Sequence, residues 1–164
     1  MNKEKRIGKV KTDTIHKMHD SNQQLIYVSD RKVAALLLIN AVLISFSATW
    51  NLKEHFILTK IIIFLAIMLA AVSTIMYLLA IIPRISKRAV ESILHYKGIL
   101  RFSRDEYVSK TLELSDDDLT KDYLDTIYSL SLIQLKKNRY LKWGSELLII
   151  AIFLLALSFI LNNI

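Results

Sequence analysis

The chain has 164 residues, of which 53% are hydrophobic and 23% charged, and its net charge is +7 at pH 7. Its length suits a single domain, and the absence of cysteine from the sequence excludes disulfides and Cys-based metal sites. No long basic run is interleaved with aromatic residues, so we expect no nucleic-acid partner.

A basic segment opens the chain. Residues 1–32 hold eight Lys and Arg, without the apolar core and small-residue exit that a signal peptide needs. We therefore predict that residues 1–32 are retained as a cytoplasmic N-terminal segment. We expect this segment to be helical from about Thr14 into the apolar block that follows.

Three uncharged apolar blocks predict membrane-spanning helices. About 20 apolar residues are needed to cross a hydrocarbon core of ~30 Å. The blocks cover residues 33–50, 61–82 and 147–164. The sequence therefore predicts an all-α membrane protein, in which a transmembrane hairpin at 33–82 precedes a third span at 147–164.

Residues 83–146 lie between the second and third spans, and we interpret them as a helical cytoplasmic insert that acts as a sensing region. The only proline, Pro83, follows the second span, and we expect it to kink a helix that resumes and runs towards Tyr96. The spacing of Ser103 and Glu106 is typical of a capping box, which predicts a short helix from there.

A long helix is predicted after the short one. Ser115 precedes three aspartates, a pattern that favours a helix start. Apolar residues from Leu119 onwards recur at helical spacing and run into the third span. We therefore predict one helix of ~45 residues, and expect it, with an extension of the second span, to project beyond the bilayer.

The sequence shows no pattern typical of catalysis or of a resident cofactor. Its three glycines form no phosphate-cradling loop. His16 and His19 have helical i,i+3 spacing but lack an evident third ligand, so a surface pair is the simpler interpretation. We expect no enzyme activity, no metal and no cofactor.

Among the few polar residues of the first two spans, four have helical spacing within their span. They are Asn40 and Ser47 in the first span, and Ser73 and Tyr77 in the second. One interpretation is hydrogen bonding between helices of one chain. The other is a seam between copies in a homo-oligomer, or a water path. The pattern alone does not separate them.

Asp30, Arg31 and Lys32 stand at the mouth of the first span. The two bases can snorkel to the lipid headgroups, but an acid gains nothing near an anionic leaflet. We therefore expect Asp30 to pair with a base of residues 83–146. Arg84 leaves the second span at the same depth, so Asp30, Lys32 and Arg84 are candidates for gripping a small anionic ligand.

The stretch YVSDRKVAALLLINAVLIS resembles the start of the Pycsar transmembrane effector family, in which the first span follows a pattern like A-D-x-K-A-x-x-L-L-x-x-N. The matching residues include Asp30, Lys32 and Asn40. Ser29 and Val33 replace two alanines, and Thr126 replaces a glutamine in the last cytoplasmic helix. The resemblance continues through IIPRIS and LRFSRDEYVSKTLEL and covers about residues 25–164.

The resemblance implies a role in bacterial anti-phage defence at the inner (plasma) membrane. In this family a partner cyclase makes cCMP or cUMP after infection. The effector senses this cyclic nucleotide and impairs membrane integrity, which causes abortive infection. We expect the same ligand, the lipid bilayer, and copies of the chain in a homo-oligomer as the partners of this protein.

Several insert residues have side chains suited to a cyclic nucleotide. Arg binds phosphate, and aromatic rings stack on bases. The candidates are Tyr96, Arg101, Phe102, Arg104 and Tyr107. The alternative is a solvated basic loop whose tyrosines anchor helices. The protein would then be a membrane-anchored adaptor or scaffold without a ligand, or a constitutive small channel subunit.

The basic residues that flank the spans predict the topology. Segments 1–32, 51–60 and 83–146 hold eight, two and twelve Lys and Arg, respectively. Cytoplasmic segments carry the excess of such residues, which places the N-terminus inside and the C-terminus outside. A reporter fused after Ile164 is expected to be periplasmic or extracellular. A cytoplasmic signal from this fusion would contradict three spans.

Overall fold

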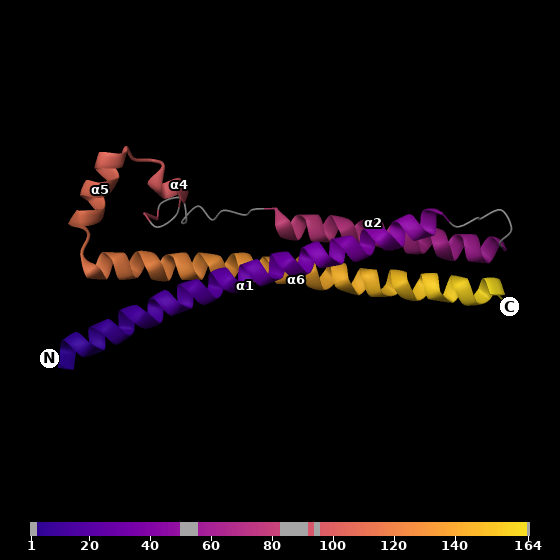
Figure 1. Ribbon diagram of the computed structural model, residues 1–164, viewed down its shortest axis with the longest axis horizontal. Helices are drawn as coiled ribbons and strands as arrows, with labels where there is room; N and C mark the ends of the chain where they lie inside the picture. The colour runs from indigo at the N-terminus through magenta and orange to yellow at the C-terminus, as the bar shows by residue number, and fades with distance from the viewer. Residues whose placement is uncertain (1–2, 50–55, 83–91, 94–95, 164) are drawn as a thin grey trace. The chain divides into compact units, whose positions relative to one another are not determined.

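The computed structural model describes residues 3–49, 56–82, 92–93 and 96–163. Most of these described residues are in α-helices, and none of them is in a strand (Figure 1). The helices are α1 (Lys3–Ala48), α2 (Ile57–Ile81), α4 (Tyr96–Ile99), α5 (Arg104–Glu113) and α6 (Asp116–Asn163). The chain divides into two compact units. Unit 1 comprises residues 1–27 and 83–135, and unit 2 comprises residues 28–82 and 136–164.

Three of the helices are long and apolar enough to cross a membrane: α1, α2 and α6. The predicted all-α fold with three spans is therefore confirmed, and the chain is a multi-pass membrane protein. α1 has 46 residues and α6 has 48. At 1.5 Å per residue these helices are about 69 and 72 Å long. Each is more than twice as long as the ~30 Å hydrocarbon core is thick.

The end of α2 corrects one prediction. The helix ends at Ile81, and Ile82 has the extended values φ −54° and ψ 121°. Steric clash with a following proline disfavours helical geometry at the preceding residue, and Ile82 precedes Pro83. The expected extension of the second span is therefore wrong at Ile82. It is also wrong at Ser92 and Ile93, which are not helical, while residues 83–91 lie outside the described ranges.

Both predicted helix starts between the second and third spans are confirmed. Ser103 accepts a hydrogen bond from the Glu106 amide, and its own amide donates to the Glu106 carboxylate at 2.9 Å. The backbone hydrogen bond from Ser103, and then its hydroxyl, stabilise the charged carboxylate and lower the pKa of Glu106. Ser115 accepts from the Asp118 amide at 3.2 Å and so caps α6.

Unit 2 packs its three helices along seams with a heptad spacing. The buried residues of α2 are Thr59, Ile63, Ala66, Ala70, Ser73, Tyr77 and Ala80, separated alternately by four and three positions. On α6, Gly144, Leu148, Ala151, Leu155 and Ser158 follow the same rhythm. This spacing is typical of helices that cross at a shallow angle with a left-handed twist. The small side chains allow the backbones to approach closely.

The closest approach joins Gly144 of α6 to Tyr77 of α2. A Cβ atom built on Gly144 would lie 2.6 Å from Cε1 and 2.9 Å from Cδ1 of the Tyr77 ring. Tyr77 is fully buried and belongs to a core cluster with Val33, Ala80 and Leu148. The ring cannot move aside without disturbing this cluster. Glycine is therefore required at residue 144 by its lack of a side chain.

We predict that Gly144→Val destabilises unit 2. Overpacking of a filled core typically costs about 1–3 kcal/mol. The free energy of unfolding, measured by SDS titration in mixed micelles and followed by circular dichroism, should fall by that amount. Ala156→Val adds similar bulk at an exposed position of α6 and should change stability little. Equal stability of both variants with the wild type would contradict the close approach.

Candidate functional site

Polar side chains in the spanning part of unit 2 join its helices. Asn40 of α1 donates to the Ala70 carbonyl at 2.8 Å and to the Thr74 hydroxyl at 2.9 Å, both on α2. Thr74 in turn donates to the Ala70 carbonyl at 3.1 Å. Asn40 is fully buried, and its Oδ1 has no hydrogen-bond partner in the described part of the chain. This amide therefore ties α1 to α2 while one acceptor stays unsatisfied.

A second set of polar contacts ties α2 to α6. Ser73 donates to the carbonyl of Gly144 at 2.8 Å, where the lack of a side chain at Gly144 lets the two helices approach closely. The Tyr77 hydroxyl lies 3.5 Å from the Ser145 hydroxyl, at the limit of a hydrogen bond. The fourth polar residue, Ser47, makes no such contact between helices among the hydrogen bonds described: it donates to the Leu43 carbonyl of its own helix, α1, at 2.7 Å.

The polar span residues had two interpretations: hydrogen bonding between helices of one chain, or a seam between copies. The contacts confirm the first for two of the residues and do not test the second. Hydrogen bonding between helices of one chain is confirmed for Asn40 and Ser73. Asn40, Ser47, Ser73 and Tyr77 are all at most 2% exposed, so their side chains lie inside a single copy. A seam between copies that involves these residues stays a prediction.

An ion pair joins α1 to α6 at one end of the apolar region of unit 2. The ammonium of Lys137 forms a short ion pair with the Asp30 carboxylate. The Lys137 side chain is 13% exposed and that of Asp30 is 42% exposed, so the pair is partly shielded from water. Beside it, the Ser29 hydroxyl donates to the Asn138 side chain at 3.4 Å. We call these four residues the α1–α6 clasp.

The clasp confirms that Asp30 has a partner among the bases of residues 83–146. The Lys32 side chain is exposed, and Arg84 lies outside the described residues. The structure therefore pairs Asp30 with Lys137, and a ligand site formed by Asp30, Lys32 and Arg84 stays a prediction. A partly shielded ammonium next to exposed carboxylate oxygen is chemically able to exchange its partner for a phosphate.

The remaining ligand candidates lie in unit 1, around the start of α5. Arg101 and Arg104 are exposed, and the Arg104 guanidinium lies 4.0 Å from the exposed Asp105. The Phe102 ring has the Lys110 ammonium 4.0 Å from its centroid. The half-buried Tyr107 donates to the Ile93 carbonyl at 3.5 Å. Tyr96 is in α4, and its side chain is outside the described part. A binding role for this set stays a prediction.

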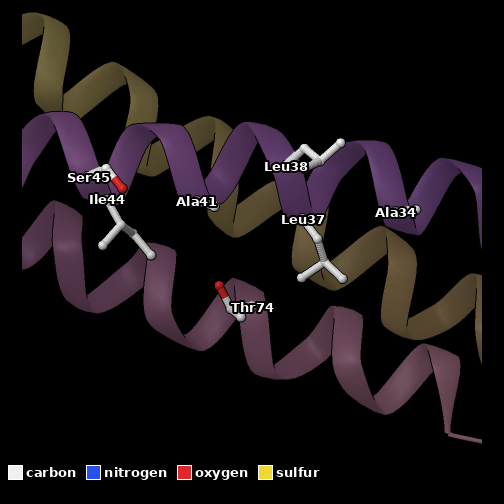
Figure 2. A pocket seen from close by; sticks show the side chains of 7 residues that line it. All are labelled: Ala34, Leu37, Leu38, Ala41, Ile44, Ser45 and Thr74. Atoms are coloured by element: carbon white, nitrogen blue, oxygen red, sulfur yellow. The ribbon is translucent and has the colours of Figure 1, made fainter.

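A groove of about 760 Å³ lies on the surface of unit 2 between α1 and α2 (Figure 2). Its lining residues are Ala34, Leu37, Leu38, Ala41, Ile44, Ser45 and Thr74. Leu37 and Ile44 extend from α1 towards α2 in the figure. Two hydroxyls are the only polar side chains of this lining, and a charged ligand at membrane depth requires paired polar partners. The groove therefore suits an apolar chain and does not suit a nucleotide.

The sequence profile of the Pycsar effector protein domain matches residues 14–162. This match covers nearly the whole chain and both units. The protein belongs to the Pycsar effector family. Membership, together with three spanning helices, indicates an anti-phage defence effector that acts in a membrane. Neither a curated protein nor a solved structure shows significant similarity to the chain.

Sequence reasoning missed three residues that complete this arrangement. Lys137 is one of several neighbouring bases, with Lys136 and Arg139. Only the alignment of α1 against α6 shows which of them faces Asp30. Thr74 accepts from Asn40, yet threonine is ordinary within a span. Gly144 carried a usable signal, because it begins the four–three series of small residues on α6.

We predict a coupling free energy of about 1.5–3 kcal/mol between Asp30 and Lys137, the range usual for hydrogen bonds to charged groups. A double-mutant cycle with Asp30→Asn and Lys137→Met should give this coupling free energy in SDS titrations. The exposed Lys142–Glu146 pair, at 3.8 Å on the same helix, is the matched control and should give less than about 0.5 kcal/mol. Equal coupling for both pairs would show that the clasp has no special role.

Proposed function

We propose that the protein is a bacterial anti-phage effector of the inner membrane that senses cCMP or cUMP and then impairs membrane integrity. Membership of the Pycsar effector family carries the proposal. The three apolar helices support a direct action on the bilayer. In this proposal the protein works as a switch in the membrane and catalyses no reaction, and a partner cyclase supplies the nucleotide.

The helix bounds support a route from ligand to membrane. α1 contributes residues 3–27 to unit 1 and 28–48 to unit 2, without a break in the helix. α6 likewise contributes residues 116–135 to unit 1 and 136–163 to unit 2. A nucleotide that binds unit 1 can therefore bias unit 2 through two continuous helices. It shifts the equilibrium only by its difference in affinity for the two states.

The α1–α6 clasp is the contact that we expect to hold the resting state. It is the point in unit 2 where α1 and α6 are joined by charge, and all four of its groups lie within two consecutive positions of each helix. A tenfold shift between states requires about 1.4 kcal/mol, and loss of one such charged contact is worth at least as much. Opening of the clasp would allow α1 and α6 to separate, and the three-helix packing of unit 2 would then be loosened.

Dye release from liposomes tests the proposal. Liposomes that carry the purified protein should release dye when cCMP or cUMP is added to the cytoplasmic face, and should not respond to linear 5′-CMP. Asp30→Asn should raise release without nucleotide, whereas Glu146→Gln, which removes an acid from the exposed control pair, should not. Equal release with and without cyclic nucleotide, for correctly inserted protein, would refute ligand gating and favour an adaptor or a constitutive channel.

A further inference from the structure

An apolar patch covers one side of unit 1. Six large apolar residues share it, four on α6 and two on α1, and each is between 41% and 57% exposed. They are Leu124, Tyr128, Leu132, Leu135, Met18 and Leu25, and we call them the unit 1 patch. A contiguous apolar surface of this kind on a water-exposed part of a protein usually marks an interaction site.

The two helices contribute to the same side of unit 1. Their contacts advance together along the chain, from His16 with Tyr123 to Asn22 with Ser131 at 3.1 Å, so α1 and α6 are parallel. At about 100° per residue, the four patch residues of α6 lie roughly a quarter turn from this line of contact. The two patch residues of α1 lie roughly a quarter turn from it in the opposite sense. On parallel helices opposite senses lead to the same side, so the patch is continuous.

The patch lies outside the hydrocarbon core. α6 continues without a break from the patch to the uncharged block that begins at residue 147. Leu135 precedes that block by 12 residues and Leu124 by 23, so the patch is about 18 to 34 Å from the block along the helix. Lys136 and Arg139 stand between them and suit the lipid headgroups. The patch therefore faces water, where covering apolar surface is favourable.

We infer that the unit 1 patch is the contact between copies of this chain, and that it joins them through parallel α6 helices in the same register. The inference does not depend on the proposed function. Every copy enters the membrane at the same residue of α6, so the patches of two copies stand at one height and in one orientation. A second copy therefore meets the patch already aligned and at a high effective concentration, whereas a soluble protein loses its orientational freedom on binding.

The spacing of the patch along α6 fits a pair of parallel helices. Leu124, Tyr128 and Leu135 follow one another by four and seven positions, as the seam residues of a left-handed coiled coil do. Lys121 lies seven positions before Tyr128, and Lys142 lies seven positions after Leu135. A lysine at a seam position specifies the register and the number of helices at a cost in stability. The two lysines therefore limit the apolar contact to the patch and favour a small oligomer.

The chemistry of the patch separates this contact from the other sites of the protein. The Tyr128 hydroxyl holds the only oxygen or nitrogen atom of the six side chains, whereas a phosphate is bound by charged or N–H donors. The patch therefore does not suit a nucleotide. The four polar residues of the first two spans are at most 2% exposed, so they reach a second copy only if unit 2 opens. The patch reaches one without any rearrangement.

Cysteine cross-linking tests the pairing, because the chain contains no cysteine of its own. In vesicles at a low protein-to-lipid ratio, Leu124→Cys and Leu135→Cys should each form a disulfide-linked dimer under mild oxidation. In a parallel pair each residue faces its own copy at a distance that a disulfide can bridge, whereas an antiparallel pair would link neither with itself. Gln24→Cys is the matched control, because Gln24 is exposed on the side of α1 turned away from α6, and it should stay monomeric.

Subunit counting by stepwise photobleaching in the same vesicles, with one fluorophore per chain, gives the second test. The wild type should bleach in two or more steps, and Leu124→Gln with Leu135→Gln in one. Both positions are exposed, so circular dichroism should show an unchanged helix content. Val108→Gln with Leu112→Gln removes two exposed apolar side chains from α5 and should keep the wild-type count.

Three results would overturn the inference: a single bleaching step for the wild type, an unchanged count for the patch variant, or cross-linking of Gln24→Cys as efficient as that of the patch positions. No nucleotide is present in either assay. A negative result here therefore leaves ligand gating untouched, and a failure of cCMP or cUMP to release dye leaves the contact between copies untouched.

Discussion

Water is absent from the hydrocarbon core, and the architecture of unit 2 depends on that constraint. Apolar faces gain nothing there by leaving lipid for one another, so helices associate through close packing and satisfied polar groups. Unit 2 uses both means. Small residues bring α2 and α6 close enough for Ser73 to reach the Gly144 carbonyl, and Asn40 joins α1 to α2. Each pair of its helices is thus connected by at least one polar contact.

Charge fixes the register of the two long helices. A slide of α1 along α6 by one turn, about 5.4 Å, would separate Asp30 from Lys137 and leave a partly shielded ammonium without its acid. Ion pairs of this kind are better attested as devices that specify register than as sources of net stability. The pair therefore distinguishes one alignment from its neighbours, and a ligand that competes for either partner changes the balance between alignments.

Much of the fold was predictable because its signals are local. Uncharged blocks of 18 to 22 residues revealed the spans, and the Ser103–Glu106 spacing revealed the start of α5. The second span ends where it was predicted, but the helix expected to resume after Pro83 is absent at Ser92 and Ile93. The pairing of Asp30 with Lys137, rather than with another base, depends on which faces of α1 and α6 meet. That is a property of tertiary packing, which one sequence does not reveal.

The contact between Gly144 and Tyr77 also constrains how such a protein can evolve. A larger residue at 144 is excluded while the ring stays, and a smaller residue at 77 opens a void that only a bulkier partner fills. Either change alone passes through a destabilised intermediate. Across diverging relatives the two positions should therefore change together, a large residue on one helix accompanying a small one on the other, although they lie far apart in the chain.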